Sequence, residues 1–166
     1  MALQFSSDWA NALLYQGLYG QFGNRGTAYD TSGGRSAVTV FQGTQPTAAQ
    51  VIASWTTYNV NFLVHWNNII APAPVGYTTL GGENRMTLTT PAAVAAFRSG
   101  TASWAIYWPA AWTQANIQSA TIPNIRFIIL PVSINSGAGC VKLTTLGLTA
   151  GTSYQPTDIS IKFGVA

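Results

Sequence analysis

The chain has 166 residues and only 7% of them are charged, whereas ordinary soluble domains carry about a quarter. Its 7 Lys and Arg residues are scattered, which argues against nucleic acid as a partner because such binding needs a basic cluster. Cys140 is the only cysteine, so an intrachain disulfide is excluded. A monomer needs charge to stay dispersed, so the composition indicates a surface partly covered by other subunits. A polar, uncharged monomeric β-domain is the alternative.

Neither a secretory leader nor a membrane span is expected. The first residues lack the basic and apolar regions of a signal peptide, and no apolar run approaches the ~20 residues that cross a bilayer. We therefore expect synthesis in a cytoplasm and no membrane partner.

The first half of the chain predicts short elements separated by glycine-rich loops. Ser6 or Ser7 caps a helix over residues 8–19, and residues 24–34 form a loop, so residues 1–35 make an N-terminal arm of helix and loop. A strand is predicted over residues 36–41 and a short helix over 47–53, just after Pro46. Alternating apolar residues predict a further strand over residues 56–66, with His65 on the face opposite Trp66.

The strongest strand signal is residues 101–108, which follow a Ser-Gly turn and end at Pro109. Alternation places Ala102, Trp104, Ile106 and Trp108 on one face, and Thr101, Ser103, Ala105 and Tyr107 on the other. Such an aromatic face needs a second layer to cover it.

The remaining segments predict mostly strands. They are a hairpin over 78–90 ending in a strand at 85–90, one or two helical turns in 91–97, an irregular connection over 111–124, strands over 125–131, 140–143 and 158–165, and a turn-rich stretch over 146–153. Six to eight strands and two or three short helices predict a mainly β chain, an antiparallel two-layer β-sandwich in a single domain over residues 1–166. Jelly-roll and immunoglobulin-like connections both stay open.

Residues that carry chemistry are scarce. His65 is the only histidine, and no Gly-x-Ser-x-Gly sequence frames a serine nucleophile. A structural zinc site needs about four Cys or His ligands, and the 4 carboxylates lie far apart in the sequence. We predict a non-enzymatic protein without metal or cofactor.

The tryptophans admit two interpretations. Trp104, Trp108 and Trp112 could form a sugar-stacking platform, or Trp104 could lie in the core with Trp108 and Trp112 at a sheet corner or subunit contact. The shared face of Trp104, Ile106 and Trp108 favours the core. The candidate interaction surface comprises Trp9, Arg25, Arg35, Tyr107, Trp108 and Trp112.

Four short motifs stand out: Asn11-Ala12-Leu13-Leu14, the turn from Gly43 to Ala49, Ser99-Gly100-Thr101-Ala102-Ser103-Trp104, and the segment from Leu146 to Thr152 before a closing strand. These motifs resemble those of small virion proteins of tailed bacteriophages. Residues 56–90 show no such likeness, and Ile106 stands where the family has an arginine.

The resemblance implies an architectural role in a virion. The expected function is head decoration (cement) through contacts with the major capsid protein or other virion proteins, as a homo-oligomer with a trimer favoured. Residues 1–35 would reach a neighbouring capsid subunit, after synthesis in the host cytoplasm. The alternative is a tail-fibre or baseplate module that binds host glycan through Tyr107, Trp108 and Trp112. Head or tail position, host and oligomeric number stay open.

Overall fold

The computed structural model describes residues 35–70, 77–80, 83–108, 112–123 and 127–164. Within these ranges it describes only the backbone of residues 35, 70, 77–80, 83–86 and 162–164. The helix predicted over 8–19, the loop over 24–34 and the motif at Asn11 lie outside the described residues.

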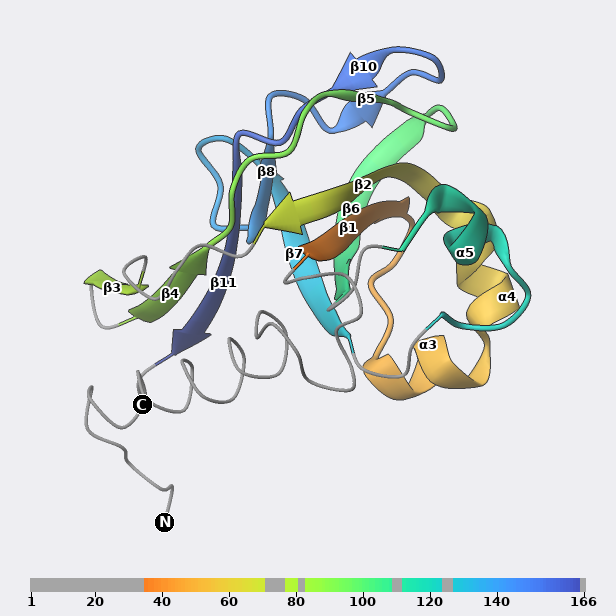
Figure 1. The fold of residues 1–166 in the computed structure, drawn as a ribbon, viewed down its shortest axis with the longest axis horizontal. Coiled ribbons are helices and arrows are strands. Elements are labelled where there is room, and N and C mark those ends of the chain that lie inside the picture. Colours follow the sequence, from red (N-terminus) through yellow and green to blue (C-terminus); the bar gives the residue numbers. More distant parts are fainter. Residues whose placement is uncertain (1–34, 71–76, 81–82, 109–111, 124–126, 165–166) are drawn as a thin grey trace.

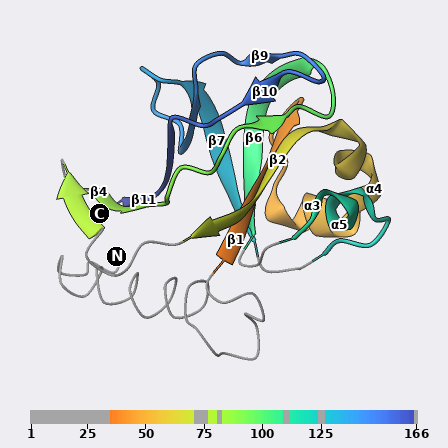
Figure 2. The same ribbon diagram turned by 45° about the horizontal axis from the view of Figure 1, so that its top comes forward.

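A strongly curled, mixed sheet forms most of the described chain and resembles half of a barrel (Figures 1 and 2). Its strands follow one another in the order β2 (Phe62–Ile70), β1 (Arg35–Gln42), β6 (Gly100–Trp108), β7 (Ile128–Ile134), β8 (Val141–Leu143), β11 (Asp158–Gly164), β4 (Glu83–Thr87) and β3 (Tyr77–Leu80). In addition, β9 (Gly147–Leu148) pairs with the start of β6, while β5 (Val94–Ala95) and β10 (Ser153–Tyr154) form a separate two-stranded sheet.

The mainly β class with few short helices is confirmed, but the predicted antiparallel sandwich is not what the described residues form. Strands β7 and β8 are parallel. The turn between them folds back on β7, where Gly139 N donates to Ser133 Oγ (3.0 Å) and Cys140 N donates to the carbonyl of Pro131 (2.8 Å). As a result β8 starts beside the middle of β7 and runs in the same direction, which alternation within each strand cannot reveal.

Short helices, not a second sheet, cover one face of β1, β2 and β6. They are α3 (Ala48–Ala53), α4 (Trp55–Tyr58), the 3₁₀-helix η2 (Asn59–Asn61) and α5 (Gln114–Gln118), which lie together on one side of these strands (Figures 1 and 2). We call the cluster beneath them the helical core; its buried residues are Ala37, Phe41, Val51, Trp55, Phe62, Trp104, Ile106, Trp108 and Ile117.

The opposite face of the same strands packs against β5, β8, β10 and β11. We call this cluster the sheet core; its buried residues are Val38, Val40, Leu63, Val64, Trp66, Ile69, Leu88, Ala96, Ala102, Ala105, Tyr107, Leu130, Cys140, Val141, Leu143, Leu148, Ile159 and Ile161. Strands β1, β2 and β6 are therefore covered on both faces.

The alternation predicted in β6 is confirmed from Trp104 onward. Trp104, Ile106 and Trp108 lie in the helical core, and Ala105 and Tyr107 in the sheet core. Ala102 was predicted beside the tryptophans but lies in the sheet core. The reason is a register shift, in which Phe41 pairs with Trp104 and Gln42 pairs with Ala102, so Ser103 is an extra residue.

Other predicted segments are confirmed in part. Strands β1 and β11, helix α3 and the β3–β4 hairpin form close to where they are expected. Strand β4 spans Glu83–Thr87 instead of residues 85–90, and β7 spans Ile128–Ile134 instead of residues 125–131. Residues 56–61 are helical instead of extended, and residues 91–97 contain β5 instead of helical turns. Three short α-helices lie within the described residues, as the prediction of two or three allows, but α5 forms inside the segment expected to be irregular.

Candidate functional site

The described side chains of the predicted interaction surface do not share one face. Trp9 and Arg25 lie outside the described residues, and Arg35 begins β1 with only its backbone described. Tyr107 and Trp108 are both 0% exposed and lie on opposite faces of β6. Trp112 is half-buried against the helical core. The burial of Tyr107 and Trp108 corrects the prediction that they are available at the surface, because both faces of β6 are covered.

Aromatic rings fill the helical core in stacked and edge-on pairs. Trp104 stacks on Phe41 with ring centroids 4.2 Å apart and planes 8° apart. Trp55 of α4 presents its edge to Phe41 at 6.3 Å and to Trp108 at 5.7 Å, arrangements that aromatic quadrupoles favour. Tyr58 contacts Trp104 and Phe127 contacts Trp108 in the same layer. These tryptophans are therefore structural and do not form a sugar platform.

A buried polar network crosses this aromatic layer. The indole Nε1–H of Trp108 donates to Thr39 Oγ1 (2.9 Å), and Thr39 Oγ1 lies 2.8 Å from His65 Nδ1. The other ring nitrogen, His65 Nε2, lies 2.6 Å from the carbonyl oxygen of Trp112. The network thus links β1, β2, β6 and the segment that leads into α5 through the imidazole of His65.

The partners determine the protonation of this imidazole. A carbonyl oxygen only accepts, so Nε2 carries the proton that is donated to Trp112. In the neutral ring Nδ1 is then an acceptor, and the Thr39 hydroxyl donates to it while accepting from Trp108. Burial lowers the pKa of His65 below its usual 6.5, and the hydrogen bond to Trp112 opposes that shift. His65 is therefore a neutral, fully bonded residue at physiological pH.

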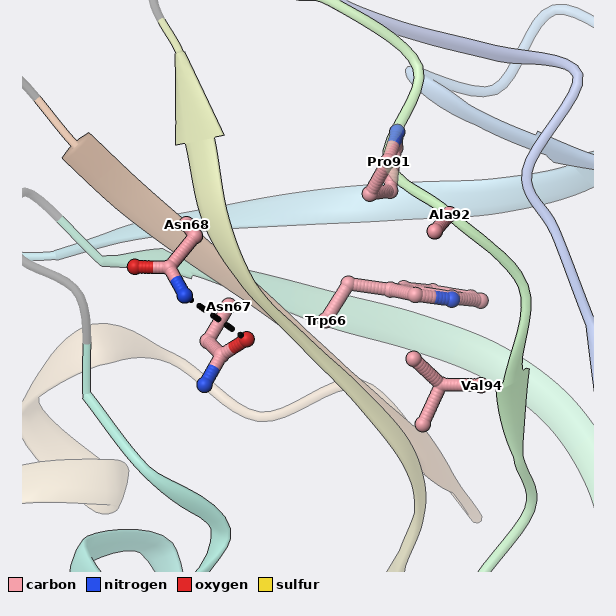
Figure 3. A pocket seen from close by; sticks show the side chains of 6 residues that line it. All are labelled: Trp66, Asn67, Asn68, Pro91, Ala92 and Val94. Carbon is pink, nitrogen blue, oxygen red and sulfur yellow. Dashed lines mark hydrogen bonds between the residues drawn. The ribbon is translucent and has the colours of Figure 1, made fainter.

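A small cleft opens at the bulge in β2 (Figure 3). Two residues, Asn67 and Asn68, lie opposite Ala37 alone, because Ser36 pairs with Ile69 and Val38 with Trp66. Asn68 adopts φ 56°, a left-handed conformation that asparagine tolerates. The cleft has about 290 Å³ of space, with Pro91, Ala92 and Val94 on its other side. None of the described residues that line it has a titratable side chain.

The indole of Trp66 forms the inner wall of this cleft. It extends from β2 toward Ala92 and Val94 (Figure 3), is 0% exposed, and donates its Nε1–H to the carbonyl of Tyr154 at 3.0 Å. With its ring covered and its donor used, Trp66 offers no stacking surface to a sugar.

The helices that cover the helical core present a face without charged residues. Residues 36–82 and 99–125 contain no Asp, Glu, Lys or Arg, so α3, α4, η2 and α5 carry none. Two apolar side chains project from this face, Ile52 on α3 with 46% exposure and Val60 on η2 with 49%. We call the outer surface of these helices the neutral helical face.

The segments around Gly43, Ser99 and Leu146 meet at one end of the sheet. Ser103 Oγ donates to the carbonyl of Gly43 at 2.6 Å. At the start of β6, Gly100 pairs with Leu148 and Thr101 with Gly147. Ala150 N donates to Ser99 Oγ at 2.9 Å. The motif residues therefore join the ends of strands, which is a structural role.

Within the part of the chain that the structure describes, no three residues among His, Cys, Asp and Glu gather into a possible metal site. None of the described helices has the length and apolarity to cross a membrane. Comparison of the chain with protein-family models, with curated proteins and with solved structures finds no match in any of the three.

Proposed function

We propose that this chain is a non-enzymatic structural protein of a tailed-phage virion, a decoration (cement) protein that binds the head through its neutral helical face. The observation that carries the proposal is that exposed helices α3, α4, η2 and α5 contain no charged residue. Helices at a protein surface ordinarily turn charged side chains to the solvent. A face without charge loses little hydration energy when it is covered, and the cores of interfaces are depleted of charged residues.

The motifs support the virion context. The segments at Gly43, Ser99 and Leu146 resemble those of tailed-phage virion proteins, and in this fold they contact one another. The partners are the major capsid protein or other virion proteins, and the chain acts as a homo-oligomer, with a trimer favoured. Its place is the virion, after synthesis in the host cytoplasm.

The first experiment is a measurement of copy number in purified particles by quantitative mass spectrometry. A decoration protein is expected in a fixed ratio to the major capsid protein. A few copies per particle would move the protein to the tail, and absence from the particle would refute a virion role.

The second experiment places a charge on the neutral helical face. Ile52→Lys and Val60→Lys change side chains that are 46% and 49% exposed, so the fold should tolerate both. We expect either variant to bind undecorated heads more weakly, because a buried lysine without a partner is costly. The matched control is Ile134→Lys, at a side chain 47% exposed in β7, away from the helices. Equal binding by all three variants would remove the helical face as the contact surface.

The alternative, a tail-fibre or baseplate module that binds host glycan, has less support. Two of its contact residues, Tyr107 and Trp108, are fully buried, which leaves the half-buried Trp112. Reduced host adsorption by a phage carrying Trp112→Ala, with the fold intact, would restore this alternative.

A further inference from the structure

We propose that His65 acts as an acid-sensitive latch: at neutral pH its hydrogen bonds hold the segment with Trp112 and α5 against the sheet, and protonation of its imidazole releases that segment before the strands separate. The inference rests on the hydrogen-bonding geometry of the helical core and does not depend on the proposed virion role.

The network is satisfied only while His65 is neutral. Thr39 is 0% exposed and has one hydroxyl proton, which it donates to Nδ1 while it accepts the indole proton of Trp108. If Nδ1 gains a proton, Nδ1 becomes the donor across this 2.8 Å contact and the Thr39 oxygen accepts from both Nδ1 and Trp108. The hydroxyl proton of Thr39 then loses its acceptor, while the bond from Nε2 to Trp112 remains. The cost of protonation is therefore this orphaned proton together with a charge in a buried layer.

Among the described residues, no counter-charge on the elements packed around His65 compensates its protonation. Strand β1 from Ser36 to Gln42, strands β2 and β6, helix α4 and helix α5 contain no Asp, Glu, Lys or Arg. The titratable group that the helices contribute to this layer is the phenol of Tyr58 on α4, which packs on Trp104. Arg35 precedes this part of β1 and its side chain is not described, and Arg126, before Phe127, lies outside the described residues. Both are cations, so neither would stabilise an imidazolium.

The sign of the pH dependence follows from this environment. In the open state His65 meets water and titrates near its usual 6.5, whereas in the closed state burial lowers its pKa, against the opposing hydrogen bond to Trp112. Above pH 6.5 His65 is neutral in both states and the closed state has its full stability. Below it the open state takes up a proton that the closed state does not, so closure weakens as the pH falls.

We expect the segment around α5 to open first, because it is held against the sheet by side-chain contacts. Helix α5 has 5 residues, too few to persist without tertiary contacts. Besides the buried Ile117, its anchors are the bond from His65 to the carbonyl of Trp112 (2.6 Å) and the bonds from Trp55 Nε1 (2.9 Å) and Asn59 Nδ2 (2.8 Å) to the carbonyl of Ser119. In contrast, backbone ladders join β2 to β1 and β1 to β6.

This layer also contains buried polar atoms that lack a hydrogen-bond partner among the described residues. Trp112 Nε1 and Asn59 Oδ1 are buried and have no hydrogen-bond partner among the described residues. Each such atom lowers the local stability, so the cost of a charge on His65 acts on the weakest part of the cover.

Hydrogen–deuterium exchange of the full-length chain between pH 7.5 and pH 5 tests the latch. We expect the protection of amides in residues 113–119 to fall below pH 6.5 by up to tenfold per pH unit, the limit for one linked proton, while amides of β1 and β6 stay protected. The same series on His65→Gln, which cannot titrate in this range, should show no such fall. A parallel fall in β1 and β6, or an equal fall in His65→Gln, would overturn the proposal.

Nitrogen-15 NMR of the His65 ring in the wild-type chain gives a readout that needs no variant. The latch requires the Nε2–H tautomer at pH 7.5 and a pKa below the usual 6.5. A protonated Nδ1 in the neutral ring, or a ring that titrates while the protection of residues 113–119 stays constant, would refute it.

Discussion

The two faces of β1, β2 and β6 are built from alternate residues of the same strands, yet they are covered in different ways. Neighbouring residues of β6 show the contrast: Tyr107 points into the sheet core and Trp108 into the helical core. The sheet core is mostly aliphatic and is closed by further strands joined through backbone ladders. The helical core is aromatic and is closed by short helices held through side-chain hydrogen bonds such as those of Trp55 and Asn59. Side chains on the two faces are thus equally buried, although backbone ladders hold one cover in place and side-chain hydrogen bonds hold the other.

The largest expected effect comes from removing the central ring of the helical core. Trp108→Ala deletes a side chain that is 0% exposed and contacts Trp55 and Phe127. We expect the free energy of unfolding in urea to fall by about 3–5 kcal/mol, the usual cost of such a cavity. Trp108→Phe keeps most of the ring and loses the bond to Thr39, so it should cost clearly less. Equal losses of unfolding free energy in the two variants would show that packing of this ring does not stabilise the helical core.

A second variant separates the polar network from the packing around it. Thr39→Val keeps the shape of a side chain that is 0% exposed but leaves Trp108 Nε1 and His65 Nδ1 without their partner. At about 1–2 kcal/mol for each of these two orphaned neutral groups, we expect a loss of about 2–4 kcal/mol in urea unfolding. Thr39→Ser restores the hydroxyl and should recover most of this loss. A Thr39→Val variant as stable as wild type would mean that the network contributes nothing.

On the other face, the weak point is the turn that makes β8 parallel to β7. A Cβ at Gly139 would lie 2.7 Å from the backbone nitrogen of Ser133, so Gly139→Ala forces the turn away from β7. We expect a loss of about 1–3 kcal/mol, typical of overpacking. The control is Gly147→Ala, where the nearest atom is 3.9 Å away and the change should stay within about 0.5 kcal/mol. Equal melting temperatures for the two variants would contradict the close approach.

These elements also show what could be predicted from the sequence. Alternation located β6 and β11, and Thr47 after Pro46 marked α3, because those signals are local. Residues 56–61 were predicted to be extended, but the bonds of Trp55 and Asn59 to the distant Ser119 stabilise helical turns there. The capping box of Thr113 and Asn116 in α5 went unrecognised because Asn116 replaces the usual Glu or Gln.

The site was less predictable than the strands. His65 was placed on its strand, but its partners Thr39 and Trp112 lie 26 and 47 residues away in sequence, and no local pattern joins them. The lack of charge was visible in the composition. Only the fold shows that the exposed helices are among the uncharged segments, because the sequence does not reveal which elements cover which face of the sheet.

The smallest expected effect concerns an ion pair between two strands that cover the sheet core. It tests whether a polar contact on this face contributes as much to stability as the His65 network does on the other face. Lys142 Nζ and Asp158 Oδ2, on the paired strands β8 and β11, are 4.0 Å apart, with their side chains 21% and 17% exposed. At that separation water still screens the charges, so Lys142→Met should change the free energy of unfolding by less than about 1 kcal/mol. Wild type should also unfold at nearly the same urea concentration with and without added salt. A loss as large as that of Thr39→Val would show that this ion pair is as important to the sheet side as the His65 network is to the helical core.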